Sequence, residues 1–204
     1  MSPTFGPPAP EDFPRVLAAL ATEQPQFYGF RDVQAWRAMA RMVCPGDPDL
    51  IALVARDGDR IAAFGLALLR PASFWPRFCA RVGVGHILRH ALAGQLARFR
   101  KRPPAAAPDR PGAPDPEWLG YARSWHQDTP GVAKAVYVYV APEHRNRSLG
   151  RALLADLAAR AQAEGFTRMD AQVRFDNPAS VRMLESLGYE VRHAGTCFHA
   201  VKPL

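Results

Sequence analysis

The chain has 204 residues, of which 48% are hydrophobic and 22% charged, with a net charge of +7 at pH 7. This length and apolar content predict one folded domain over residues 1–204 and exclude a disordered chain. The sequence has no run of about 18 apolar residues, so no membrane span is predicted. It has no basic segment followed by an apolar segment at its start, so no signal peptide is predicted. The three cysteines, Cys44, Cys79 and Cys197, are odd in number and widely spaced, which favours a reducing, cytoplasmic location.

The first 70 residues carry the patterns of two helices and a hairpin. Apolar residues at helical spacing, such as Val33, Trp36 and Val43, predict the second helix. The Asp57-Gly58 pair between two strand-like runs is a strong signal for a tight turn. The predicted elements are a short strand near Thr4, helices over 11–21 and 31–43, and strands over 50–55 and 61–69.

Residues 70–130 differ from the rest and are predicted to be an insertion within the one domain. Residues 60–108 contain nine Lys or Arg and no acid, and 85–102 place four apolar residues on one helical face. Six of the fourteen residues over 103–116 are proline, which removes backbone donors there. We expect a basic helical insertion that covers the active site or contacts an anionic substrate.

The insertion also suggests candidate partners. Phe74, Trp75 and Phe78 are candidate anchors at an anionic membrane surface or walls of an acyl pocket. An acidic carrier protein is a further candidate for the basic helix. Nucleic acid is not expected, because the basic residues lie on an amphipathic helix without a groove-reading pattern. No metal is predicted either: His86 and His90 have ligand spacing, but no third ligand is evident.

The C-terminal third alternates strands and helices. The β-branched and aromatic run over 132–140 predicts a buried strand, and leucines at helical spacing predict a helix over 148–164 that ends at Gly165. This alternation predicts an α/β fold with a mixed sheet. The remaining predicted elements are a strand over 168–173, a helix over 178–187, and strands over 189–192 and 196–201.

The stretch PEHRNRSLGRALL, residues 142–154, has the character of an anion-binding loop that opens a helix. The first N–H groups of a helix attract phosphate, and the backbone that approaches it needs small residues. Ser148 and Gly150 are small, and Asn146 tolerates a left-handed backbone. The predicted cradle consists of Arg145, Asn146, Arg147, Ser148, Leu149, Gly150 and Arg151.

This stretch resembles motif A of the GNAT acyltransferase superfamily, in which a strand and a Pro precede Gln/Arg-x-x-Gly-x-Gly/Ala at a helix start. Residues 177–189, NPASVRMLESLGY, resemble motif B, where an Asn begins a short helix that ends in Leu-Gly-Phe/Tyr. The resemblance covers roughly residues 132–202. It implies an α+β fold with a mixed, mostly antiparallel central sheet flanked by helices, and places the basic insertion between the third and fourth strands.

Two registers of motif A compete. Arg145-x-x-Ser148-x-Gly150 keeps the family's spacing from Pro142 but replaces a glycine, whereas Arg147-x-x-Gly150-x-Ala152 satisfies the pattern two residues further along. We expect the first, because the strand end and the leucine stripe fix the length of the loop.

The resemblance implies acyl-CoA-dependent N-acyl transfer, with acetyl-CoA as co-substrate and a primary amine of a small molecule or peptide as acceptor. In the family, the motif A loop holds the pyrophosphate of coenzyme A. Backbone groups of the preceding strand hold the pantetheine and the acyl carbonyl, and here they belong to Val138 and Val140. Asn177 is implied to orient the cofactor or the acceptor.

The acid and the base are harder to assign. The motif B Tyr that protonates the leaving thiolate in the family is replaced by Leu184, which leaves Tyr139 as a candidate and Tyr189 as a core residue. His126 and Asp128, just before the strand, are candidate bases, since histidine titrates near neutral pH, although both residues also suit a polar loop.

Alternatives therefore stay open at the level of sequence. The absent Tyr favours a module that binds acyl-CoA without catalysis. An acyltransferase with a carrier-protein donor or a membrane-associated acceptor is another alternative. The oligomeric state, including a homodimer, is not fixed by the sequence.

Overall fold

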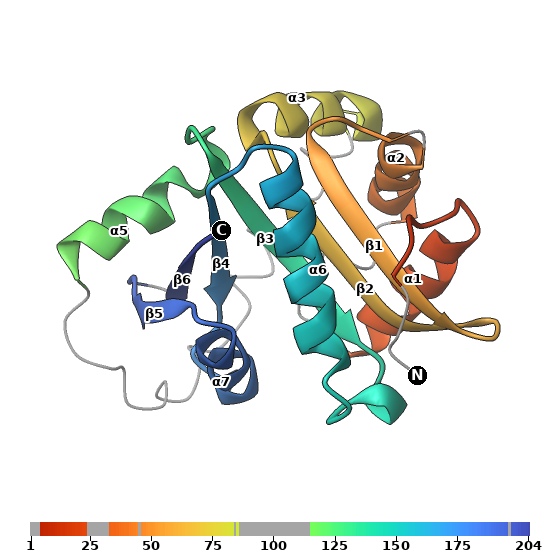
Figure 1. Ribbon diagram of the computed structural model, residues 1–204. Helices are drawn as coiled ribbons and strands as arrows, with labels where there is room; N and C mark the ends of the chain where they lie inside the picture. Colours follow the sequence, from red (N-terminus) through yellow and green to blue (C-terminus); the bar gives the residue numbers. More distant parts are fainter. Residues whose placement is uncertain (1–4, 24–32, 45, 84, 86–114, 196) are drawn as a thin grey trace, which may run out of the picture.

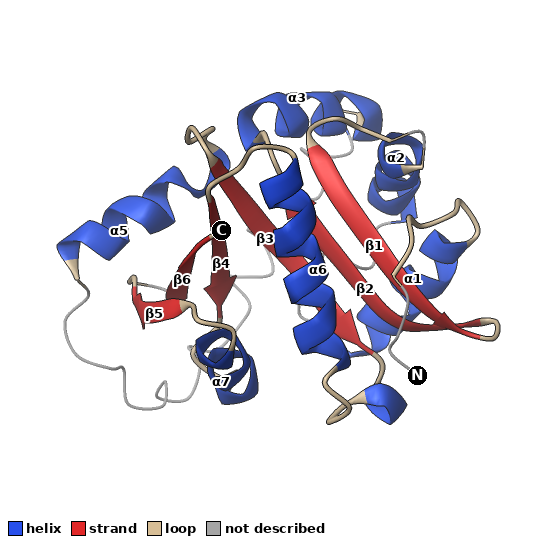
Figure 2. Ribbon diagram, viewed as in Figure 1, coloured by secondary structure: helices blue, strands red, loops and turns tan. Residues whose placement is uncertain are grey.

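The computed structural model describes residues 5–23, 33–44, 46–83, 85, 115–195 and 197–204. Its helices and strands alternate as the sequence predicts for an α/β chain (Figure 2). The strands are β1 (Leu50–Asp57), β2 (Arg60–Leu68), β3 (Val132–Val140), β4 (Arg168–Val173), β5 (Glu190–His193) and β6 (Phe198–Pro203). The helices are α1 (Asp12–Glu23), α2 (Val33–Val43), α3 (Pro71–Val82), α5 (Pro116–Arg123), α6 (Leu149–Ala163) and α7 (Pro178–Ser186), with single 3-10 turns η2 (Ser124–His126) and η3 (Pro142–His144).

The described strands form a six-stranded sheet in the order β1-β2-β3-β4-β6-β5, which runs from right to left in Figure 1. Every neighbouring pair is antiparallel except β3 and β4, which are parallel. A parallel pair needs a crossover, and α6 provides it. The predicted mixed, mostly antiparallel sheet with flanking helices is confirmed.

The predictions for residues 1–130 have mixed outcomes. Thr4 lies outside the described residues, although Gly6 forms an isolated antiparallel bridge with Val54. The insertion was predicted between the third and fourth strands, with a strand near Thr4 counted as the first. If that strand is not counted, the insertion lies between β2 and β3. The basic helix predicted over 85–102 falls almost wholly outside the described residues. The helices α3 and α5 were not predicted, because each is short and neither has a long apolar period.

Two apolar cores lie on the two faces of the sheet, because successive strand residues point to opposite sides. The helix α6 crosses one face (Figure 1), and Leu153 and Leu157 pack there against Leu53 and Ala63. On the other face, the helices α1, α2 and α3 contribute Phe13, Met42 and Phe74 to a cluster with Val54, Phe64 and Leu66. None of the helices that the structure describes is long and apolar enough to cross a bilayer.

The position of α6 on the sheet depends on a close approach at Gly65 of β2. A Cβ atom at this residue would lie 2.9 Å from Leu157 Cδ1 and 3.1 Å from Leu153 Cγ. The packing leaves room only for a hydrogen atom at the Cα of Gly65. The absence of a side chain there therefore determines how close α6 lies to the strands.

We therefore expect Gly65→Val to lower the free energy of unfolding by about 1–3 kcal/mol, since overpacking a tight core displaces its side chains. Gly120→Ala in α5 is the matched control, because nothing lies within 4 Å of its Cβ position. Urea unfolding followed by circular dichroism measures both changes. A Gly65→Val protein as stable as the wild type would contradict this account of the packing.

Candidate active site

The sheet opens between β3 and β4. These strands pair from Val132 and Arg168 as far as Ala135 and Ala171, whereas β3 continues to Val140. On its other edge β3 stays paired with β2 up to Val140. The second half of β3 therefore leaves β4 while remaining part of the sheet, and it borders an opening between the two parallel strands.

A β-bulge marks the point at which the strands part. The register between β2 and β3 shifts at Val136, which has no partner in β2 although Ala135 and Tyr137 both do. Because a bulge adds one residue, it changes the alternation of side chains beyond it. Val136 and Tyr137 both pack on the α1–α3 side, and Val138 and Val140 pack on the α6 side.

The polar backbone groups of Val138 and Val140 point into this opening. The next residue, Ala141, donates its N–H to the carbonyl of Ala62 at 2.9 Å, so it faces the extension of β2. Residues in a strand direct their N–H and C=O groups to alternate sides. Val140 and Val138 therefore face away from β2, and the Val140 carbonyl accepts a hydrogen bond from Arg145 Nε at 3.2 Å.

The loop between β3 and α6, which is the predicted anion cradle, has two residues with a left-handed backbone. Asn146 and Ser148 have φ of 60° and 59°, and no other non-glycine residue among those described has a positive φ. Ser148 stands where the preferred register of motif A replaces a glycine, and the left-handed conformation is the one that favours glycine. The geometry thus supports that register. The side chains of Arg145, Asn146, Arg147 and Ser148 are exposed, and Leu149, the first residue of α6, is buried.

The first turn of α6 is fastened to β3 and to α7. A Cβ atom at Gly150 would lie 3.2 Å from Val140 Cγ2 and 3.4 Å from Met183 Sδ, so this position needs a small residue. Arg151 Nη2 donates to the carbonyl of Ser186 at 3.2 Å, at the C-terminal end of α7. The guanidinium of Arg151 therefore joins the two motif helices. The Ser148 side chain forms no capping hydrogen bond at the start of α6.

The motif B residues have structural contacts. Asn177 accepts a hydrogen bond from the Ser180 N–H at 3.1 Å and so caps α7. Leu184 is 2% exposed and lies in the core beneath α6. Tyr189 is also buried, as expected for a core residue, and burial raises the pKa of its phenol. Neither residue provides an exposed acid at the opening.

The three predicted catalytic residues lie at different places. Tyr139 is 5% exposed and packs on the α1–α3 side, whereas the Val138 and Val140 side chains face α6. His126 is exposed at the end of η2, with its ring centroid 5.9 Å from that of Trp75. Asp128 Oδ1 accepts the N–H of Ala72 at 2.7 Å and so caps the first turn of α3.

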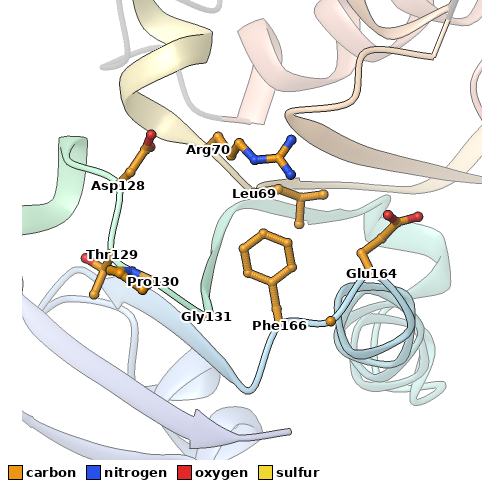
Figure 3. Close-up of a pocket in the computed structure, with 9 residues that line it drawn as sticks. Leu69, Arg70, Asp128, Thr129, Pro130, Gly131, Glu164 and Phe166 are labelled. Atoms are coloured by element: carbon orange, nitrogen blue, oxygen red, sulfur yellow. The ribbon is translucent and has the colours of Figure 1, made fainter.

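Asp128 also borders a hollow of about 370 Å³ that is distinct from the opening. In Figure 3 this hollow lies where β3 begins and α6 ends, and Arg70, Glu164 and Phe166 line it. The cradle lies at the opposite end of α6, a helix of 15 residues and so roughly 22 Å long. The structure therefore does not bring Asp128 together with the Arg145–Arg151 loop.

The structure brings together a polar cluster that the sequence analysis did not assemble. Lys134, Asp170 and His199 are buried on β3, β4 and β6, on the face away from α6. His199 Nε2 lies 3.3 Å from Asp170 Oδ2, and Arg168 Nε lies 2.9 Å from Asp170 Oδ1. Each of the three is a polar residue in a mostly apolar strand, and this pattern is visible in the sequence. Their proximity could not be predicted, because it depends on the strand order.

The described residues contain no group of three or more His, Cys, Asp or Glu that could hold a metal ion. His86 and His90, which have ligand spacing in the sequence, lie outside the described residues.

Comparison with solved structures gives the same fold. One similar structure is the PaiA N-acetyltransferase of Thermoplasma acidophilum in complex with coenzyme A, with 11% identity, a TM-score of 0.60 and coverage of 100% of both chains. A second is the ribosomal-protein-S18-alanine N-acetyltransferase of Escherichia coli, with 14% identity, a TM-score of 0.54 and coverage of 100% of this chain and 93% of that chain. A third is a phosphinothricin acetyltransferase of Sinorhizobium meliloti in complex with acetyl-CoA, with 17% identity, a TM-score of 0.56 and coverage of 100% of this chain and 89% of that chain. At these identities the likeness is one of fold.

A family model described as the acetyltransferase (GNAT) family matches residues 13–189, which is most of the chain. The match includes both motifs, the opening between β3 and β4, and the cradle at the start of α6. The chain therefore belongs to the GNAT family of acetyltransferases.

Proposed function

We propose that the protein is an acyl-CoA-dependent N-acyltransferase that transfers acetyl from acetyl-CoA to a primary amine of a small molecule or peptide. The observation that carries the proposal is the opening between β3 and β4, into which the backbone groups of Val138 and Val140 point, next to a basic loop with a left-handed backbone at the start of α6. Similar folds occur in proteins described as complexes with coenzyme A or acetyl-CoA.

The cradle suits the pyrophosphate of coenzyme A. The first N–H groups of α6 have no acceptor within the helix, and the helix dipole favours an anion there. Arg145 and Arg147 are exposed beside these groups, and Asn146 and Ser148 turn the backbone around them. Leu149 and Gly150 would contribute backbone contacts, and Arg151 would contribute charge from its place between α6 and α7.

The pantetheine arm would lie in the opening. It is an extended chain with two amide groups, and such chains add to a free strand edge through backbone hydrogen bonds. Val138 and Val140 offer these groups, and Asn177, which begins α7 after β4, would orient the cofactor or the acceptor. The arm would bring the thioester toward the bulge at Val136, where the sheet is open.

Acyl transfer forms a C–N bond and breaks the C–S bond of the thioester. The amine must lose a proton, and the thiolate leaves with a modest pKa, so a dedicated acid is not essential. A reaction without a dedicated acid is consistent with the burial of Leu184 and Tyr189. Tyr139 is also buried, so it would have a reduced role as an acid. We propose His126 as the base, directly or through water, because its ring is exposed beside Trp75 of α3, whereas the carboxylate of Asp128 already caps α3.

A module that binds acyl-CoA without catalysis is the second candidate. The buried Leu184, in place of the family's Tyr, is the observation that favours it. A carrier-protein donor, an anionic membrane surface, a homodimer and a cytoplasmic location stay predictions, as does the extent of the insertion.

Removing both exposed arginines of the cradle tests the proposal. We expect Arg145→Ala/Arg147→Ala to weaken acetyl-CoA binding at least tenfold in isothermal titration, because two charges near the pyrophosphate are lost. Arg15→Ala/Arg160→Ala removes the same charge from side chains that are each 45% exposed, and should bind like the wild type. A wild-type protein that binds no acetyl-CoA would overturn the proposal.

The left-handed Ser148 gives a second prediction. We expect Ser148→Gly to raise the free energy of unfolding by about 0.5–1 kcal/mol and to retain acetyl-CoA binding, since glycine adopts this conformation without the side-chain clash. Ser148→Ala should leave stability unchanged, because the hydroxyl caps nothing. Chemical denaturation measures both. A loss of stability in Ser148→Gly would show that the residue is not under backbone strain.

The two candidate bases should respond differently to substitution. We expect His126→Ala to lower kcat about 100-fold, the typical contribution of a general base, with acetyl-CoA affinity unchanged. Asp128→Ala should instead lower the free energy of unfolding by about 1 kcal/mol, through loss of the α3 cap. Thiol release across a panel of amines measures kcat. Equal turnover by His126→Ala and wild type would remove this residue from the mechanism.

A further inference from the structure

The hollow of about 370 Å³ at the end of α6 has no part in the proposed acyl transfer. A second hollow, of about 320 Å³, adjoins it, and the two share the lining residues Leu69, Arg70, Glu164 and Phe166. Pockets for small organic ligands have volumes of roughly 300–1,000 Å³. The hollows are therefore large enough for a small ligand, and the residues common to both indicate its chemistry.

Backbone hydrogen bonds fix the walls of the first hollow. The carbonyl of Gly131, just before β3, accepts the N–H groups of Thr167 and Arg168 at 2.8 and 3.0 Å. The carbonyl of Asp49 accepts the N–H of Leu69 at 2.8 Å. These bonds join the starts of β3 and β4 and hold the end of β2 in place. The hollow is thus formed before a ligand arrives, which reduces the entropy lost on binding.

Two side chains of opposite charge line both hollows. The side chain of Arg70 is 56% exposed, and its Nη1 lies 3.3 Å from Asp49 Oδ1, a carboxylate that Arg77 also binds. This single contact leaves Nε and Nη2 of Arg70 available to a further acceptor. Glu164 is exposed, and its carboxylate has no hydrogen bond or ion pair within the described ranges. Arg70 and Glu164, both described, do not pair with each other.

The surface between these two charges is apolar. Figure 3 shows Leu69 and the half-buried ring of Phe166 together, with Arg70 above them and Glu164 beside them. The other acid of the first hollow, Asp128, is engaged in the cap of α3. Asp47, the further acid of the second hollow, accepts the N–H of Asp49 and a hydrogen bond from Arg77.

The pair of opposite charges narrows the class of ligand. A phosphate or a dicarboxylate would be attracted to Arg70 but repelled by Glu164, and a diamine would meet the reverse. A molecule with one carboxylate and one ammonium close together satisfies both side chains at once. The apolar surface of Leu69 and Phe166 adds a preference for an apolar or aromatic group on the same molecule.

We infer that this hollow binds a free α-amino acid with an apolar side chain, with its carboxylate at Arg70, its ammonium at Glu164 and its side chain over Leu69 and Phe166. The site is separate from the opening between β3 and β4. Gly131 precedes Ala135, where the opening begins, by a paired stretch of β3 roughly 13 Å long. The ligand is therefore not the acceptor, and the inference holds independently of the proposed acyl transfer.

The test is isothermal titration of the full-length protein with L-phenylalanine and with two analogues that each lack one charge. Phenethylamine lacks the carboxylate, and 3-phenylpropionate lacks the ammonium. Because each charge adds a charge-assisted hydrogen bond, we expect L-phenylalanine to bind at least tenfold more tightly than either analogue. Glycine, which lacks the apolar group, should also bind at least tenfold more weakly. Absence of L-phenylalanine binding, or equal binding of either analogue, would overturn the inference.

Substitution of the two charged residues assigns the site. Glu164→Gln should weaken L-phenylalanine binding at least tenfold and leave 3-phenylpropionate binding unchanged, because only the ammonium contact is lost. Arg70→Gln should weaken L-phenylalanine binding to a similar extent and leave phenethylamine binding unchanged, and Asp49 keeps its pair with Arg77 in this variant.

The matched controls are Glu185→Gln in α7 and Arg15→Gln in α1, which make the same substitutions at exposed side chains that line neither hollow. Both should bind L-phenylalanine like the wild type. Glu164→Gln is the decisive variant, because its side chain is exposed and supports no contact of the fold within the described ranges. If this variant binds L-phenylalanine as tightly as the wild type, the inference is wrong.

Discussion

The parting of β3 from β4 after Ala135 and Ala171 is the feature on which the rest of the candidate site depends. Two adjacent parallel strands normally satisfy each other's backbone groups along their whole length. Here the bulge at Val136 turns β3 away, and the packing on either side keeps the opening from closing: α6 rests on Gly65 of β2, and Met183 of α7 lies near Gly150. The opening is thus built into the core, and the polar groups of Val138 and Val140 face it.

The same parting divides the chemistry between the two faces of the sheet. Val138 and Val140 turn their side chains to α6 and the cradle, whereas Val136 and Tyr137 face α3 and η2. The first side has a helix start and exposed arginines, which suit the proposed anionic cofactor, and the second side is lined by aromatic rings. Because the bulge shifts the register of β3 by one residue, this one strand borders both the cradle and the aromatic rings.

Much of the C-terminal half could be predicted from the sequence, because its signals are local. The leucine stripe of α6, the stop at Gly165 and the left-handed tolerance of Asn146 are all properties of short stretches, and they have the expected geometry. The bulge could not be predicted, since it depends on the register with β2. The cluster of Lys134, Asp170 and His199 depends on strand order in the same way. The roles of Asp128 and Arg151 were also beyond sequence analysis, because their backbone partners are 56 and 35 residues away.

The anchors of α3 and η2 have an implication for how such a protein can diversify. Asp128 holds the start of α3, Lys134 holds η2, and Trp118 of α5 is buried beside His199. Both ends of the intervening stretch are therefore pinned to the scaffold independently of what joins them. Since the entropy of closing a loop grows only slowly with its length, that stretch could be lengthened, shortened or exchanged with little penalty to folding. Evolution could in this way vary the surface over one face of the sheet while the face covered by α6 keeps its architecture.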